Sequence, residues 1–190
     1  MKRWYTSDTH FFHENIIKLC HRPFENVHSM NGCIRRNWNE IVDPDDEVYH
    51  LGDVYLNRIK GGNASADNVN SFLGSLNGHK YVVLGNHDDP NDYILKSHFT
   101  ILPPNYEVKY EDKRIVLSHY PMRAWNGSFG GSLHFFGHTH GLLENTQQSM
   151  DVGVDCWNFA PILSSVSSMG MTNGKPIEED KYRDAVIKPR

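Results

Sequence analysis

The feature that most constrains this fold is a series of short apolar runs, each followed at once by polar residues. The runs occupy residues 3–7, 47–51, 80–84, 114–118 and 133–136. Four or five residues are too few for a buried helix, but they match the usual length of a strand in a sheet. The sequence therefore predicts strands at these positions, with polar side chains placed where the strands end.

Helical spacing separates the strands of the first half. Apolar residues recur three and four positions apart in residues 30–42 and 66–76. Shorter helices are expected at residues 14–20 and 92–96. A glycine-rich polar segment at residues 58–63 is expected to be a loop.

The second half of the chain is rich in expected strands. Residues 106–110 and 114–118 flank a charged turn and predict a hairpin, and residues 150–154 form a further strand. Alternating strands and helices followed by strands predict an α/β fold. The expected form is a β-sandwich of two sheets packed face to face, with helices outside.

The length of the chain favours one domain. It has 190 residues and a mass of 21.9 kDa, within the usual range of a single domain. We expect one domain over residues 1–190, with a polar C-terminal tail over roughly residues 170–190.

Charge and cysteine usage exclude several classes of protein. The net charge is −4 and the pI is about 6.3, so the chain lacks the basic footprint of a protein that binds nucleic-acid backbones. Three cysteines without CxxC spacing predict neither a disulfide framework nor a thiolate zinc site. Neither a signal peptide nor an apolar run long enough for a membrane span is present, so a cytoplasmic location is expected.

The polar clusters at the strand ends combine ligand types for divalent transition metals. They are Asp8-Thr9-His10, Gly52-Asp53, Gly85-Asn86-His87-Asp88, His119 and Gly137-His138-Thr139-His140. In open α/β sheets, ligands bind beyond the carboxyl ends of the strands, so the clusters are expected to converge. Carboxylate, amide and imidazole groups would then surround one site. Each cluster alone is a weak signal. The order and spacing of all five clusters along the sequence form the specific signal.

Local spacing supports shared metal binding. Asp8 and His10 are two residues apart, which on a strand places both side chains on one face. His138 and His140 have the same spacing, although a loop there would divide them between two ions. The glycines before the ligands, Gly52, Gly85 and Gly137, are expected to let the backbone bend sharply.

The order of these motifs, from Asp8 to His140, resembles the calcineurin-like metallophosphoesterase superfamily. The small size is similar to its minimal bacterial and phage phosphoesterases, as is the segment from Asp151 to Asp155. The resemblance implies a four-layer α/β/β/α fold. It also implies a phosphodiesterase or phosphatase that acts on a small phosphorylated substrate, such as a nucleotide, through metal-activated water.

The resemblance further implies the role of each motif residue. The first metal ion would be bound by Asp8, His10, Asp53 and His140. The second would be bound by Asp53, Asn86, His119 and His138. Asp53 would bridge the two ions, and His87 would serve the leaving group. Val54 follows Asp53 where some members carry an acidic residue, which affects the expected substrate contacts and leaves the metal centre intact.

Mixed nitrogen and oxygen ligands suit Mn²⁺ first, and also Fe²⁺, Zn²⁺, Ni²⁺ or Co²⁺, better than Ca²⁺. A nuclease acting on DNA or RNA is one alternative function, against which the acidic balance argues. A non-catalytic scaffold that retains the fold is another. The presence of every motif residue favours catalysis.

Four further positions carry weaker expectations. Arg22 and Arg123 are candidates for binding substrate phosphate, because a guanidinium fork matches phosphate oxygens, while a plain surface position is the alternative. Asp88 would either orient His87 or another imidazole, or cap a helix. His50, in the strand before Gly52, is expected to support the site.

Overall fold

The computed structural model describes residues 1–56, 64–163 and 165. Its first sheet has five strands in the order β4-β3-β2-β1-β9. The four parallel strands are β1 (Arg3–Thr6), β2 (Glu47–His50), β3 (His79–Val83) and β4 (Thr100–Leu102). A two-residue strand, β9 (Ile162–Leu163), pairs antiparallel with β1.

The second sheet has four strands in the order β5-β6-β7-β8. They are β5 (Tyr106–Tyr110), β6 (Lys113–Leu117), β7 (Leu133–Phe136) and β8 (Ser149–Asp151). The β5–β6 hairpin is antiparallel, whereas β6, β7 and β8 run parallel. Side chains from both sheets form a shared core, in which the Tyr5 and Phe135 rings meet edge to face at 4.9 Å. This packing confirms the predicted two-sheet α/β sandwich.

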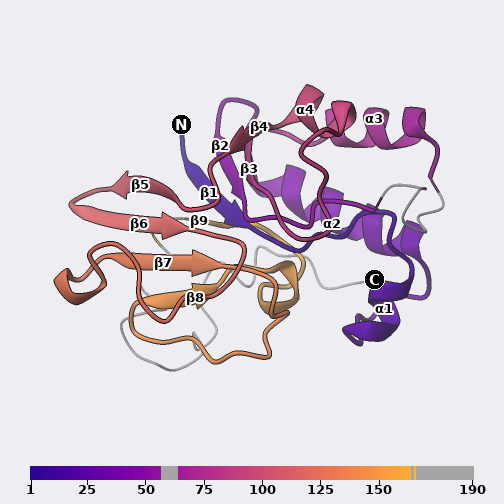
Figure 1. Cartoon of the computed structure of the whole chain (residues 1–190). Coiled ribbons are helices and arrows are strands. Elements are labelled where there is room, and N and C mark those ends of the chain that lie inside the picture. Colours follow the sequence, from indigo (N-terminus) through magenta and orange to yellow (C-terminus); the bar gives the residue numbers. More distant parts are fainter. Residues whose placement is uncertain (57–63, 164, 166–190) are drawn as a thin grey trace.

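In the part of the chain that the structure describes, helices α1 to α4 follow strands β1, β2 and β3 of the first sheet (Figure 1). They are α1 (Asn15–Leu19), α2 (Val27–Ile41), α3 (Ala66–Gly74) and α4 (Tyr93–His98). A second core joins this layer to the sheet, through Ile34 and Trp38 of α2 and Val48 of β2. On the second sheet, Trp125 stacks on His134 at 4.9 Å and covers part of the outer side.

Each predicted strand and helix is present and in the expected order, and the elements differ at their ends. Helix α2 begins before the expected residue 30 because Asn26 and Ser29 form a reciprocal capping box. The last predicted strand stops at Asp151, and a 3₁₀ turn, η3 (Val154–Cys156), follows. Strands β4 and β9 were not predicted, because three and two residues are too few to show a period.

Some of the predictions concern residues that the structure does not describe. The predicted loop at residues 58–63 and the tail at residues 170–190 lie outside the described residues, and the single-domain assignment stays a prediction. Within the described part of the chain, every helix is too short or too polar to span a membrane. All three cysteines are free thiols, as predicted.

Candidate metal centre

Parallel strand ends bring the polar clusters together. The segments that follow β1 and β2 remain hydrogen-bonded to each other. The Asp8 N–H donates to the Gly52 carbonyl, and the His10 N–H donates to the Asp53 carbonyl, both at 3.0 Å. The second sheet joins them, because the His138 N–H donates to Asp8 Oδ2 at 2.8 Å. The site therefore lies across the carboxyl ends of both sheets.

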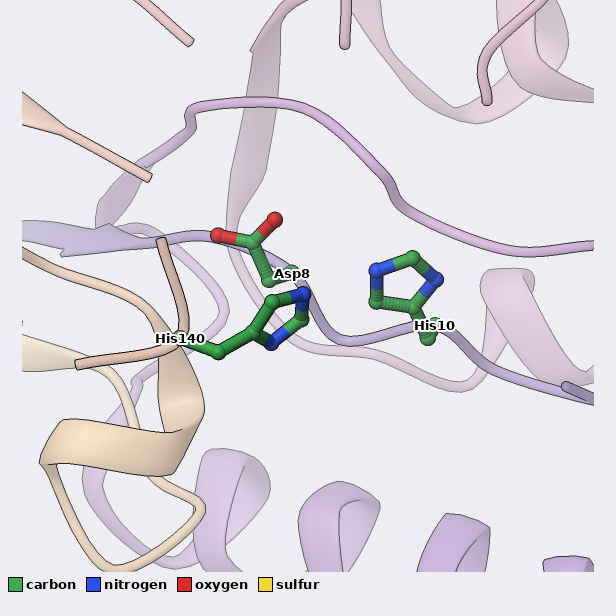
Figure 2. Close-up of side chains that lie close together, drawn as sticks. All are labelled: Asp8, His10 and His140. Atoms are coloured by element: carbon green, nitrogen blue, oxygen red, sulfur yellow. The ribbon is translucent and has the colours of Figure 1, made fainter. Parts of the chain in front are cut away.

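The first group of candidate ligands, called cluster one, comprises Asp8, His10 and His140. One ligand atom from each of the three lies within 4.8 Å of the others. Figure 2 shows the carboxylate and the two rings gathered together, with Asp8 and His10 after β1 and His140 on the loop after β7. Asp8 and His10 are buried, and the rings of His10 and His140 stack at 5.3 Å.

The second group, called cluster two, comprises Asp53, His119 and His138, again with one ligand atom from each within 4.8 Å. Asn86 joins it, because its Oδ1 lies 3.0 Å from His119 Nε2. His138 and His140 thus belong to different clusters, which is the loop arrangement that the sequence left open. Both clusters contain the residues that the resemblance implied, and their role as ligands stays a prediction.

Asp53 lies between the two clusters. Its Oδ2 is 3.5 Å from His10 Nε2 and 3.7 Å from His119 Nε2. His87 Nε2 lies 4.0 Å from the same oxygen. The other oxygen, Oδ1, accepts a hydrogen bond from the His87 N–H at 2.9 Å. One carboxylate therefore reaches both groups of imidazoles, as a bridging ligand would.

The backbone at these residues is strained. Five candidate ligands have a left-handed φ: Asp8 (56°), His10 (48°), Asp53 (58°), His138 (69°) and His140 (48°). This conformation costs roughly 1–3 kcal/mol for a residue other than glycine, and it concentrates at functional sites. Asp8 and His10 therefore reach the same cluster through two left-handed turns of the backbone, and the expected strand alternation does not apply.

Two side-chain atoms that lack a hydrogen-bond partner show whether a metal ion would fit in cluster one. The buried atoms Asp8 Oδ1 and His10 Nε2 have no hydrogen-bond partner. Burial raises the pKa of the Asp8 carboxyl to about 8, so its charged form lacks compensation. A divalent cation would satisfy the Asp8 and His10 atoms together, so these residues fit a metal ion.

His119 gives independent support for a cation in cluster two. Its Nδ1 lies 2.7 Å from the Leu51 carbonyl, which only accepts, so Nδ1 carries the proton. Burial lowers the pKa of His119, which favours the neutral ring. Its Nε2 lone pair then faces the Asn86 oxygen, and two facing acceptors are the arrangement that a shared cation stabilises.

The glycines before the ligands matter mainly because they have no side chain. Gly52 has a φ of 97°, as the predicted sharp bend requires. Gly85 and Gly137 lack a positive φ, so they do not use the left-handed conformation that favours glycine. A Cβ on Gly85 would overlap Asp53 Oδ1, and one on Gly137 would overlap the side chains of Ser7 and Asp8. These two glycines allow chain segments to approach closely.

The predicted substrate contact of Arg22 is wrong. Its side chain is buried, and the guanidinium donates to both Asp155 oxygens and to the carbonyls of Asp8 and Thr9. A further contact to the Met30 sulfur occupies the remaining N–H. All five donors are used, so Arg22 supports the site from behind. Arg123 is exposed, and its role in binding phosphate stays a prediction.

Asp88 has neither of the two roles considered for it. It accepts the N–H groups of Asp53, Val54 and Gly85 at 2.8–3.0 Å, and so joins the loops after β2 and β3. His50 supports the site as expected. Its Nδ1 accepts from the Gly52 N–H at 3.2 Å, and burial lowers its pKa to about 3, so the ring stays neutral.

Three neighbours of the clusters lie outside the predicted set of metal ligands. Asp155 Oδ2 lies 2.7 Å from His140 Nδ1. His13 Nδ1 lies 3.2 Å from His10 Nδ1. The half-exposed Tyr120 packs edge-on against His119 and His138, with ring centroids 4.8 and 4.7 Å away. His13 and Tyr120 adjoin motif residues in the sequence, whereas nothing local links Asp155 to His140.

No protein-family model matches the chain. The chain is 33% identical over 168 residues to an uncharacterised protein of Methanocaldococcus jannaschii, covering 85% of this chain and 86% of that protein. It is 23% identical over 184 residues to the Gene 66 protein of Mycobacterium phage L5, covering 81% of this chain and 86% of the phage protein.

Two solved structures share the fold. A protein of unknown function from Aquifex aeolicus has a TM-score of 0.70 and 25% identity, covering 88% of this chain and 98% of that one. Nuclease MPE from Pseudomonas putida has a TM-score of 0.50 and 18% identity, covering 73% of this chain and 60% of that one. The chain therefore belongs to one family with the Methanocaldococcus jannaschii protein. Its two-sheet fold, with the motif residues at the strand ends, agrees with the resemblance to the calcineurin-like metallophosphoesterase superfamily.

Proposed function

We propose that this chain is a phosphoesterase that uses two divalent transition-metal ions to hydrolyse a phosphodiester or phosphomonoester bond of a small phosphorylated substrate, such as a nucleotide. One observation carries the proposal: two clusters of metal-ligand side chains meet at Asp53, and two buried side-chain atoms of cluster one lack a hydrogen-bond partner. Cluster one with Asp53 would hold one ion. Cluster two with Asn86 would hold the other.

Two such ions, when bound, supply Lewis acidity, which polarises phosphoryl oxygen and lowers the pKa of water. The carboxylates of Asp8 and Asp53 offset part of the positive charge. His87 Nε2, at the edge of the centre, donates a proton to the leaving-group oxygen. The Tyr120 ring packs beside cluster two and limits the directions from which the substrate approaches.

The mixed oxygen and nitrogen donors favour Mn²⁺, followed by Fe²⁺, Zn²⁺, Ni²⁺ or Co²⁺. We also propose a cytoplasmic location, with which the three free cysteines agree. The net charge of −4 favours a small substrate over a long nucleic acid, whose backbone calls for a basic surface.

The test combines metal content with hydrolysis. Metal-free protein is loaded with Mn²⁺, analysed for bound metal, and assayed on bis-p-nitrophenyl phosphate, p-nitrophenyl phosphate, and labelled DNA and RNA oligonucleotides. We expect about two ions per chain and hydrolysis of one of the small esters. Absence of bound Mn²⁺ would overturn the proposal. Faster cleavage of the oligonucleotides would identify a nuclease, and two bound ions without any hydrolysis would identify a scaffold.

Asp53→Asn tests the shared carboxylate. Because one carboxylate faces both clusters, the variant should lose affinity for both ions together, and hydrolysis should fall at least 100-fold. Asp112→Asn, on the exposed turn of the β5–β6 hairpin, is the matched control and should keep both ions. If Asp53→Asn retained both ions and full activity, the bridge would be assigned wrongly.

A further inference from the structure

Arg22 and Asp155 form an ion pair directly behind cluster one. Arg22 Nε lies 2.8 Å from Asp155 Oδ1, and Nη2 lies 2.8 Å from Oδ2. The Arg22 side chain is fully buried and that of Asp155 is 10% exposed. Two parallel hydrogen bonds of this kind fix the plane of the carboxylate as well as its position.

The fixed carboxylate orients His140. Asp155 Oδ2 lies 2.7 Å from His140 Nδ1. Since an ionised carboxylate only accepts, Nδ1 carries a proton, and the neutral ring then presents its lone pair at Nε2. The same ring belongs to cluster one, beside Asp8 and His10 (Figure 2). Asp155 therefore selects the tautomer that a metal ligand requires.

Arg22 also holds the other side of cluster one. Its Nη2 donates to the Asp8 carbonyl at 2.7 Å, and its Nη1 donates to the Thr9 carbonyl at 3.1 Å. These carbonyls belong to the segment in which Asp8 and His10 have left-handed backbones. One guanidinium thus ties the strained segment after β1 to the carboxylate that orients His140.

Cysteine at position 20 raises another interpretation of the same residues. Ligand atoms of Cys20, His140 and Asp155 lie within 4.8 Å of one another, which could suggest a further ion. The Arg22 guanidinium already occupies both Asp155 oxygens, and an ion there would face its positive charge at short range. Hydrogen-bonded support of His140 explains this cluster better than a further ion.

We propose that Arg22 and Asp155 are positioning residues that set the metal affinity of cluster one without setting that of cluster two. The proposal rests on the proposed function, because it takes cluster one as a metal site. Cluster two has separate support, since His119 Nδ1 donates to the Leu51 carbonyl. Removing the Arg22–Asp155 pair should therefore affect one ion of the two.

Asp155→Asn is the sharpest variant because it keeps the shape of the side chain. Its amide has one oxygen where the carboxylate has two, so it can no longer accept from Arg22 Nε, Arg22 Nη2 and His140 Nδ1 together, and the orientation of His140 is no longer fixed. Calorimetric titration of the metal-free variant with Mn²⁺ should show one ion bound 10–100-fold more weakly and the other within about threefold of the wild type. Asp112→Asn is the matched control.

Arg22→Lys keeps the positive charge but removes the forked guanidinium, so it should weaken binding of the cluster-one ion about tenfold. Arg36→Lys, on the exposed face of α2, is the control and should leave the binding of both ions unchanged. The electron paramagnetic resonance spectrum at two Mn²⁺ equivalents supplies a second readout. The wild type should give a spin-coupled pair, whereas Asp155→Asn should give the six lines of an isolated ion.

Three outcomes decide the matter. If the wild type binds no Mn²⁺, the proposed function fails. If the wild type binds two ions and Asp155→Asn binds both equally well, this inference alone is overturned. Equal weakening of both ions, together with a lower melting temperature of the metal-free variant, would show a general folding role and would also overturn it.

Discussion

His87 differs in exposure from Asp53, the carboxylate that it faces. Its side chain is 39% exposed, whereas that of Asp53, which it faces, is 2% exposed. It follows Asn86 in the sequence, and its backbone N–H is anchored to Asp53 Oδ1. A proton donor at the edge of the centre is well placed for a leaving group that departs into water.

Replacing His87 should separate catalysis from metal binding. His87→Ala should retain both Mn²⁺ ions and lose roughly 10²–10⁴-fold in kcat if the ring acts as a general acid. The loss should be smaller for p-nitrophenyl esters than for alkyl esters, because p-nitrophenolate needs little protonation. The measurement is kcat for both ester types, with metal content determined on the same preparation.

Two results would contradict this role. Equal losses for the two leaving groups would assign His87 to positioning the phosphate. Loss of a metal ion from the variant would make His87 a ligand, or a support for one, and the general-acid role would have to be abandoned.

At the scale of elements, the site depends on how closely the strand ends approach. Gly137 follows β7 and lies against Ser7 and Asp8, which follow β1. The two strands belong to different sheets, so this contact fixes how the sheets meet at the site. The two sheets can therefore meet closely at the site only if residue 137 has no side chain.

Gly137→Ala should force these strand ends apart. We expect a loss of stability of about 1–3 kcal/mol or more, because the added methyl overlaps both neighbours, together with weaker Mn²⁺ binding. Gly32→Ala, in the interior of α2 with nothing within 4 Å of the new Cβ, is the control and should stabilise the chain by roughly 0.5–1 kcal/mol. Urea unfolding and Mn²⁺ titration measure both. A neutral effect of Gly137→Ala would show that the strand ends adjust freely.

At the scale of the molecule, stability should depend on the protonation of a histidine that is not one of the candidate ligands. His134 of β7 is fully buried, with Nε2 2.8 Å from the Ser118 hydroxyl and Nδ1 2.9 Å from the Ser149 hydroxyl. Burial lowers its pKa from 6.5 to about 4. Between these values the unfolded chain binds a proton that the folded chain does not, so stability falls as the pH falls.

The His134 contribution is fully present above pH 6.5 and is lost as the pH approaches 4. By pH 5 the wild type should have lost roughly 2 kcal/mol through this group. His134→Asn removes the titration, so the stability gap between wild type and variant should narrow by that amount between pH 7 and pH 5. Urea unfolding of the metal-free proteins measures it, and the gap at pH 7 and 8 serves as the internal control. A gap independent of pH would contradict the prediction.

The sequence by itself determined the order of the longer strands and the helices, and the residues available as metal ligands. Both depend on local signals: short apolar runs, helical periodicity, and Asp, Asn and His placed directly after strands. Helix α2 illustrates the limit of these signals, because its start was set by the Asn26 cap and not by its apolar positions. The tail and the loop at residues 58–63 lie outside what the structure describes.

Tertiary structure decided how those residues are used. The His138 N–H meets Asp8 across 130 positions of the chain, and Arg22 meets Asp155 across 133. Such pairings placed His138 and His140 in different clusters and turned Arg22 from a predicted substrate contact into a buried support. No local pattern encodes them, because each joins segments that are distant in the sequence, and the contact of His138 with Asp8 also depends on the space that Gly137 leaves where the two sheets meet.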